Sequence, residues 1–133
     1  MDAACEPSVQ THTLSLDLFQ FDRAFPSPLF CALTLLGDGA CLVAVGGEPL
    51  PFAWQRDASV AIPRPNAAPA ATSLANSASS SLALSQRLAR RYNSQVFLSL
   101  DLSSLADRAD RAMVPMEKAL VQALDTVLER KKP

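Results

Sequence analysis

Cysteine and histidine are the residue types in this chain that could support nucleophilic chemistry. The cysteines are Cys5, Cys31 and Cys41, and His12 is the sole histidine. A thiol enzyme would require one of these cysteines to lie beside His12, which would act as the base that deprotonates the thiol. We favour the simpler interpretation that the cysteines are small core residues and His12 a surface strand residue, because free cysteine is among the most buried residue types.

The spacing of these residues also gives little support for a metal or phosphate site. No Cys-x-x-Cys pair occurs, and three cysteines with one histidine lack the spacing of a zinc site. The glycines form neither a phosphate-binding loop nor a dinucleotide fingerprint, and we interpret them as turn residues. The sequence therefore predicts no cofactor and no metal ion.

Three arginines in a predicted helix, Arg87, Arg90 and Arg91, are the polar candidates for a partner-binding surface. Residues three and four apart share a helical face, so these side chains could contact an acidic patch or a phosphate group. The alternative is an ordinary solvated face. Nucleic acid is not expected, because 12 basic residues are balanced by 13 acidic ones, giving a net charge of -1.

Two other groups of side chains have structural interpretations. Met113 and Met116 have the spacing of a helix, and we expect them in the core rather than on an adaptable binding surface. Asp107 and Asp110 are interpreted as acids near a helix start and not as a catalytic pair.

Length and composition predict a single domain. A chain of 133 residues with 49% hydrophobic content can bury one substantial core but not two. An odd number of cysteines, without a signal-like N-terminal segment, favours a reducing intracellular compartment. The longest apolar stretch, residues 29–36, is too short to span a membrane. We expect a flexible N-terminus over residues 1–10 and one domain over residues 11–131.

The first half of the chain is predicted to form strands. Polar and apolar residues alternate over residues 11–18, which predicts a strand with its leucines in the core. Residues 29–36 and 40–45 flank Gly37 and Gly39, whose freedom to adopt positive φ favours a tight hairpin. A further strand is predicted over residues 52–62, followed by a proline-rich loop or linker over residues 63–70.

The hairpin over residues 29–45 is apolar on both faces. A turn centred on Asp38 places Cys31, Leu33 and Leu35 on one face with Cys41, Val43 and Val45, while the other face takes Ala32, Leu36, Ala40, Leu42 and Ala44. If helices cover one face of the sheet, the second face still needs a cover, which argues for a second sheet layer or a partner subunit. Among these residues we choose Leu33, Leu35 and Val43 as candidate partner contacts.

The second half contains two predicted helices around one strand. After a short strand over residues 72–76 and a serine-rich segment, a helix is expected from Ser80 or Ser81 to about Tyr92. Residues 95–100 alternate as a strand. The last helix is expected to begin near Pro115, because proline is costly in a helix interior, with residues 104–112 as a separate turn or a kinked extension. Residues 63–81 are expected to form a mobile loop.

One ordered set of short motifs resembles a known family. Thr-Ser-Leu at residues 72–74 is followed by a serine-rich run at 77–81, Gln-Arg-Leu-Ala-Arg at 86–90 and Gln-Val-Phe at 95–97. This order resembles the proteasome assembly chaperone 4 family. Together with the strand pattern, it favours an α+β fold with an antiparallel sheet system of about six strands and two helices, in the order βββββαβα.

The resemblance implies a chaperone without catalytic activity. A member of this family is expected to form a heterodimer with proteasome assembly chaperone 3 and to bind an alpha-type subunit, alpha subunit 5 in our prediction, during assembly of the alpha ring of the 20S core particle. The implied localisation is the cytoplasm, with the nucleus left open. Two alternatives stay open: a protein-interaction adaptor unrelated to the proteasome, and a thiol-dependent enzyme. Neither nucleic acid nor a membrane is an expected partner.

Overall fold

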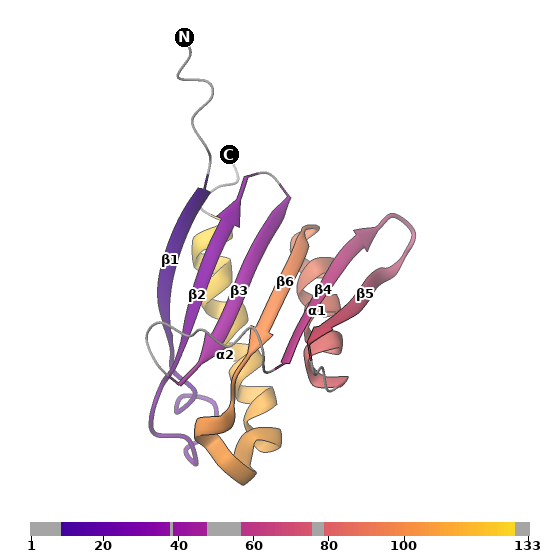
Figure 1. Ribbon diagram of the computed structural model, residues 1–133. Coiled ribbons are helices and arrows are strands. Elements are labelled where there is room, and N and C mark those ends of the chain that lie inside the picture. The colour runs from indigo at the N-terminus through magenta and orange to yellow at the C-terminus, as the bar shows by residue number, and fades with distance from the viewer. Residues whose placement is uncertain (1–8, 38, 48–56, 76–78, 130–133) are drawn as a thin grey trace.

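The computed structural model describes residues 9–37, 39–47, 57–75 and 79–129 of the chain. They form an α+β fold with the predicted order βββββαβα, which confirms the expected fold class (Figure 1). A short 3₁₀ helix, η2 (Ser103–Arg108), joins the last strand to the last helix. The strands are β1 (Val9–Leu16), β2 (Leu29–Leu36), β3 (Ala40–Gly46), β4 (Asp57–Arg64), β5 (Ala67–Ala75) and β6 (Gln95–Leu100). The helices are α1 (Ser79–Tyr92) and α2 (Ala109–Glu129).

The six strands form one sheet in the order β1-β2-β3-β6-β4-β5. Neighbouring strands are antiparallel except β3 and β6, which run parallel. This parallel pair follows from the connection between them, because the chain leaves β3, forms the β4–β5 hairpin and α1, and then returns beside β3. The sheet is therefore mixed, and mostly antiparallel.

Both helices pack on the same face of this sheet (Figure 1). Helix α1 covers β4, β5 and β6, and α2 lies behind the half of the sheet that contains β1. The core between helices and sheet contains Leu16, Leu33, Val43, Leu84, Leu88, Leu98, Met116, Leu120 and Leu124, each at most 1% exposed. Burial of these apolar side chains is the main force that holds the helices on the sheet.

The β2–β3 hairpin has the register that the sequence predicts. Leu35 is paired with Cys41, Leu33 with Val43 and Cys31 with Val45. Gly37 and Gly39 have φ values of 86° and 82°, in the left-handed region where glycine is favoured. The helix-facing positions of this hairpin are buried, whereas Ala32, Thr34 and Leu42 on the opposite face are only partly buried.

The proline-rich segment was expected to be a loop, and this expectation is wrong. Residues 57–64 and 67–75 form the β4–β5 hairpin. Pro65 lies in its two-residue turn, and Pro63 and Pro69 lie where the register shifts between Ile62 and Arg64. At a turn, at an irregularity or on an edge strand such as β5, the missing N–H of proline breaks few or no ladder hydrogen bonds.

The described residues also correct the boundaries of two segments expected to be mobile. Val9 and Gln10 belong to β1, within the predicted flexible N-terminus of residues 1–10. Residues 79–81 form the first turn of α1, within the predicted mobile loop of residues 63–81. The predicted short strand over residues 72–76 is the second half of the longer strand β5. Residues 52–56 of the strand predicted over residues 52–62 lie outside the described residues, and residues 57–62 belong to β4.

Helix α2 begins six residues before the predicted start at Pro115, which lies inside the helix. Proline interrupts one main-chain hydrogen bond there, at a cost of about 3 kcal/mol in an isolated helix. Ala112, Met116, Ala119 and Leu120 are each at most 3% exposed. Because burial of this apolar stripe requires helical geometry on both sides of Pro115, tertiary packing overrides the local signal.

Candidate interaction surfaces

The three candidate arginines are divided between two roles. Arg87 forms a two-point ion pair with Glu117, with distances of 2.7 Å from Nε to Oε2 and 2.6 Å from Nη2 to Oε1. Arg91 pairs in the same way with Asp125, at 3.2 and 2.7 Å. Both acidic partners belong to α2, so Arg87 and Arg91 join the two helices to each other.

Tyr92, the only tyrosine of the chain, also contacts the ion pair of Arg91 and Asp125. The Tyr92 hydroxyl donates a hydrogen bond to Oδ1 of Asp125 at 2.7 Å. Burial and this bond to a carboxylate raise the pKa of the Tyr92 hydroxyl. The pKa of Arg91 is also raised, first by its hydrogen bonds to Asp125. This group therefore keeps its charges at neutral pH and fixes the end of α1 against α2.

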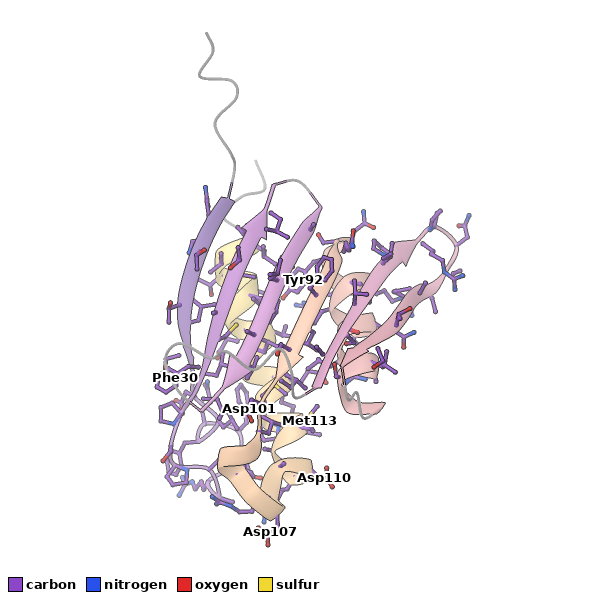
Figure 2. The ribbon with its side chains drawn as sticks, in the orientation of Figure 1. Phe30, Tyr92, Asp101, Asp107, Asp110 and Met113 are labelled. Atoms are coloured by element: carbon purple, nitrogen blue, oxygen red, sulfur yellow. The ribbon has the colours of Figure 1, made fainter. Side chains whose placement is uncertain are left out.

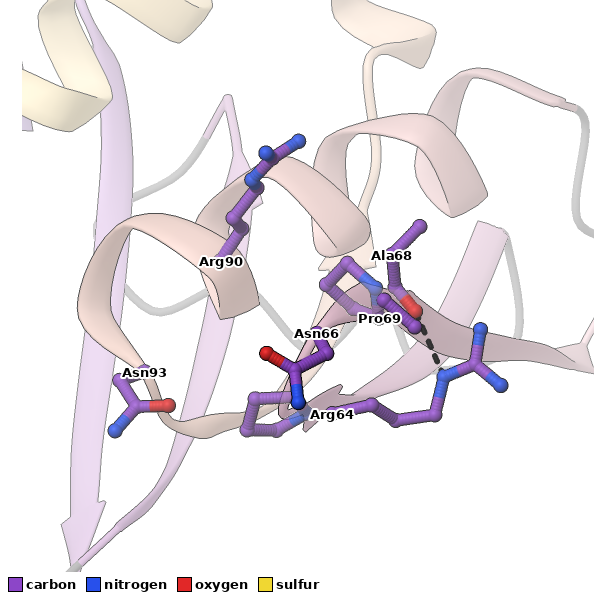
Figure 3. A pocket seen from close by; sticks show the side chains of 8 residues that line it. Arg64, Asn66, Ala68, Pro69, Arg90 and Asn93 are labelled. Atoms are coloured by element: carbon purple, nitrogen blue, oxygen red, sulfur yellow. Dashed lines mark hydrogen bonds between the residues drawn. The ribbon is translucent and has the colours of Figure 1, made fainter.

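Arg90 is the candidate arginine that remains available. Its side chain is exposed, and it makes no hydrogen bond or ion pair to the part of the chain that the structure describes. It lines a pocket of about 370 Å³ with residues of the β4–β5 hairpin (Figure 3). Sequence reasoning placed Arg90 on a binding face but did not connect it with the hairpin, because that segment was expected to be a loop.

The apolar candidates Leu33, Leu35 and Val43 face the helices. They are 0%, 4% and 0% exposed, respectively, and belong to the hydrophobic core. These side chains therefore offer no surface to a partner in this fold. The residues that alternate with them in β2 and β3 place their side chains on the opposite side of the sheet, as the predicted alternation requires.

We define the open sheet face as the side of the sheet opposite α1 and α2. Across its centre, Thr34, Leu42, Phe97, Val60 and Thr72 stand in register on five neighbouring strands. The adjacent row consists of small residues, with Ala32, Ala44, Ser99 and Ala58 in register. None of these positions carries a charge. Ala44, Ser99 and Ala58 are at most 6% exposed, so the surface open to a partner is the row of larger side chains, against which a second sheet can pack.

The open sheet face is exposed toward both edges of the sheet, at Ile62 and Thr72 on the β4–β5 hairpin and at Thr11 and Thr13 on β1. Ile62 lies on β4 next but one to Val60, on the same face, and is 47% exposed. Phe97, Val60 and Leu42 are partly buried. Figure 2 shows the side chain of Phe30, on β2, near the end of the same sheet. The face is therefore apolar at its centre, polar along β1, and only partly covered within the described structure.

Cys31 and Cys41 lie in the core and not at an accessible site. They are 0% and 4% exposed. Burial raises the pKa of the Cys31 thiol to about 12 and that of Cys41 to about 11. The thiolate is the nucleophile, so both thiols are unreactive at neutral pH. Cys5 lies outside the described residues.

His12 lies on β1 opposite Leu33 and is partly buried. Its Nε2 atom has no hydrogen-bond partner among the described residues. The expected surface position on a strand is therefore only partly right. The described residues contain no group of three or more histidine, cysteine or acidic side chains that could hold a metal ion. Within the same ranges, no helix is long and apolar enough to cross a membrane.

The remaining candidates have the positions predicted for them. Met116 is fully buried and Met113 packs against the core. Asp107 and Asp110 are exposed at the end of the molecule where η2 meets α2 (Figure 2). Asp110 lies in the first turn of α2, where a negative charge stabilises the helix dipole.

Comparison with known families decides the identity of this fold. The model of one family, described as proteasome assembly chaperone 4, matches residues 28–102, more than half of the chain. The chain belongs to the proteasome assembly chaperone 4 family. The match begins just before β2 and ends just after β6, so it includes five of the six strands and α1. A comparison with curated proteins finds no match.

Family membership assigns the chain to chaperones of proteasome assembly. The strands that form the centre of the open sheet face all lie inside the matched residues, whereas β1 and α2 lie outside them. Sequence reasoning recognised the family from the motifs around α1 and β6. It missed the pocket beside Arg90 and the buried contacts of α1 with β4, because both depend on a hairpin that proline obscured.

Proposed function

We propose that this chain promotes assembly of the alpha ring of the 20S proteasome, as a heterodimer with proteasome assembly chaperone 3 that binds an alpha-type subunit. In this role it catalyses no reaction. The observation that supports the proposal is the open sheet face, whose uncharged and partly exposed row of side chains, centred on Leu42, Phe97 and Val60, lies inside the region shared with the family. We place this activity in the cytoplasm, with the nucleus as a second compartment.

The open sheet face suits a permanent partner better than a changing client. Apolar side chains in register on three neighbouring strands, Leu42, Phe97 and Val60, form a surface of the kind that packs against another sheet about 10 Å away. Proteasome assembly chaperone 3 is the partner that we assign to this face. An alpha-type subunit, alpha subunit 5 in our proposal, then binds the assembled dimer elsewhere, so that it can leave when the ring matures.

The heterodimer is tested by mixing purified chain and proteasome assembly chaperone 3 and measuring their affinity. Ile62→Glu places a charge on the open sheet face at an exposed position, so the chain should fold while dimer affinity falls at least tenfold, because the interface would bury an unpaired charge. Val114→Glu is the matched control, since Val114 is 63% exposed on α2. Equal affinities for the two variants would contradict the assignment of the face.

The assembly role is tested by capture of the tagged chain from its own cells, followed by mass spectrometry. We expect proteasome assembly chaperone 3 and alpha-type subunits, without mature proteolytic complexes. Ile62→Glu should lose both kinds of partner and Val114→Glu should lose neither. Capture of neither partner by the folded wild-type chain would contradict the proposed function and favour an adaptor with other partners.

A further inference from the structure

We propose that the pocket between the β4–β5 hairpin and the end of α1 binds an acidic peptide segment with at least two carboxylates. Its polar lining consists of Arg64, Asn66, Arg90 and Asn93 (Figure 3). Pro63 and Pro69 are part of its apolar lining. The volume of about 370 Å³ accommodates a few residues of an extended chain. Binding in this pocket does not depend on the proposed contact with proteasome assembly chaperone 3, whose test residue Ile62 directly precedes Pro63 on β4.

The backbone that forms the pocket is fixed at two asparagines. Asn66 has a φ of 63° in the two-residue turn of the hairpin, and Asn93 has a φ of 50° just after α1. Asparagine adopts this left-handed conformation more readily than most residues. The N–H of Ser94 donates to the carbonyl of Ala89 at 3.2 Å, as in a Schellman cap, which fixes the end of α1. The two turns thus hold the rims of the pocket in place.

The charge of the pocket is positive and unopposed. Arg64 and Arg90 are exposed, and none of the lining residues is acidic. The end of a helix carries about half a negative charge, which is much less than two full positive charges. The neighbouring arginines of α1 are neutralised by Glu117 and Asp125, whereas Arg90 has no acidic partner among the described residues. Charge complementarity therefore favours an anionic ligand.

The arrangement of the arginines favours two carboxylates over one. Arg64 uses its Nε to donate to the carbonyl of Ala68 at 2.8 Å, which orients the side chain along the hairpin and leaves its terminal nitrogens for a ligand. Figure 3 shows the Arg64 and Arg90 side chains pointing in different directions from the pocket. Each guanidinium can bind a carboxylate through two parallel hydrogen bonds. A segment with two or more acidic side chains can therefore pair with both arginines.

The edge strand β5 provides a surface along which such a segment can lie. Pro69 has no N–H, and its carbonyl accepts a hydrogen bond from Nε2 of Gln86 at 3.0 Å. With the carbonyl of Ala68 occupied by Arg64, this end of the edge does not offer a free pair of main-chain groups for strand addition. Recognition there must therefore rely on side chains, and the arginines and asparagines are the ones available.

We test this inference by nuclear magnetic resonance on the isolated ¹⁵N-labelled chain. The probe is a capped six-residue peptide of alternating glutamate and alanine, and its control replaces every glutamate by glutamine. We expect the glutamate peptide alone to shift backbone signals of residues 63–69 and 90–94 and the Nε–H signals of both pocket arginines. Shifts confined to other residues, or equal shifts with the glutamine peptide, would overturn the proposal.

Variants provide the second measurement. Arg64→Gln and Arg90→Gln should each lower the affinity for the glutamate peptide at least fivefold. Raised salt should lower the affinity of the wild-type chain for the same peptide. Arg23→Gln is the matched control, because Arg23 is exposed and does not line the pocket. Loss of binding in the control to the same extent would show nonspecific attraction and reject the site. Inorganic phosphate that competes fully at equal concentration would show a small-anion site instead.

These outcomes differ from those that test the proposed function. The pocket experiment uses one purified chain and a synthetic peptide, so its failure leaves the heterodimer with proteasome assembly chaperone 3 untouched. Conversely, Ile62→Asn adds no charge beside Arg64, so it should weaken the heterodimer while the peptide still binds within twofold of the wild-type affinity. Loss of peptide binding in Ile62→Asn would place the ligand on the open sheet face and contradict the pocket.

Discussion

The hydroxyl of Ser59 on β4 lies 2.6 Å from the hydroxyl of Ser81 in the first turn of α1, and both residues are fully buried. Ser59 also lies 3.1 Å from the hydroxyl of Ser85, which donates to the carbonyl of Leu82. Three buried hydroxyls thus satisfy one another where α1 begins to pack on the sheet. Such a group fixes the position of the helix along the strand, because a shift would leave polar atoms buried without partners.

Ser59→Ala should therefore destabilise the chain. The substitution removes the hydroxyl that contacts both Ser81 and Ser85, and an unsatisfied buried hydroxyl costs about 1–3 kcal/mol. Urea denaturation followed by circular dichroism measures the change in the free energy of unfolding. Ser15→Ala is the control, since Ser15 is exposed on β1, and it should change stability by less than about 0.5 kcal/mol. Equal effects would show that the buried hydroxyls contribute nothing specific.

The single tyrosine should ionise at higher pH in the folded chain than in the unfolded chain. The pKa of Tyr92 is raised above its ordinary value of 10.0, first by burial and then by its hydrogen bond to Asp125. A raised pKa contributes stability that is present below pH 10 and lost as the pH rises through the folded value. Tyrosinate absorbance, followed with and without urea, measures both midpoints. Asp125→Asn should move the folded midpoint down, and no change would contradict the assigned interaction.

Cys31 and Cys41 should resist alkylation while the chain is folded. Their pKa values, raised to about 12 and about 11, leave about one thiol in a thousand or fewer ionised at pH 8. Iodoacetamide treatment followed by peptide mass spectrometry should find both residues unmodified in buffer and modified in urea. Rapid modification of either residue in the folded chain would revive the hypothesis of a thiol-dependent enzyme.

The turn between β2 and β3 gives a prediction that depends on backbone conformation alone. Gly37 and Gly39 have positive φ, and a Cβ atom at either position would meet no atom within 4 Å. Alanine at either site should therefore destabilise the chain by about 1–2 kcal/mol through backbone strain and not through a clash. Asparagine at the same site should cost less, because it tolerates the left-handed region. Thermal unfolding of the alanine and asparagine variants provides the comparison.

The sequence was most informative where hydrophobic periodicity and turn chemistry agreed. The β2–β3 register followed from the two glycines, which predict a turn centred between them, and the bounds of β6 matched the prediction at both ends. The prediction that Leu84 and Leu88 of α1 are buried was also correct. In each case, local propensity and core packing favour the same structure, so the sequence pattern was sufficient.

The prediction failed where proline occupies positions that its missing N–H and fixed φ locally disfavour. Pro63 and Pro69 are tolerated because β4 shifts register and β5 is an edge strand, and both facts depend on partners distant in the sequence. Pro115 is tolerated because packing on the sheet buries a continuous apolar stripe of α2 on both sides of it. The roles of Arg87 and Arg90 could not be separated for the same reason, since only the tertiary structure shows which arginine meets an acid.

The open sheet face should make the isolated chain self-associate. Phe97, Val60 and Leu42 form its apolar ridge, and Ile62 extends it at 47% exposure. Without a partner subunit, two copies can exclude water from these surfaces by pairing them. Light scattering at tens of micromolar should therefore give a mass above that of the monomer, and Ile62→Glu should return it to the monomer while Val114→Glu does not. A monodisperse wild-type monomer would show that this face is stable in water, and its apolar character would then not by itself require a partner.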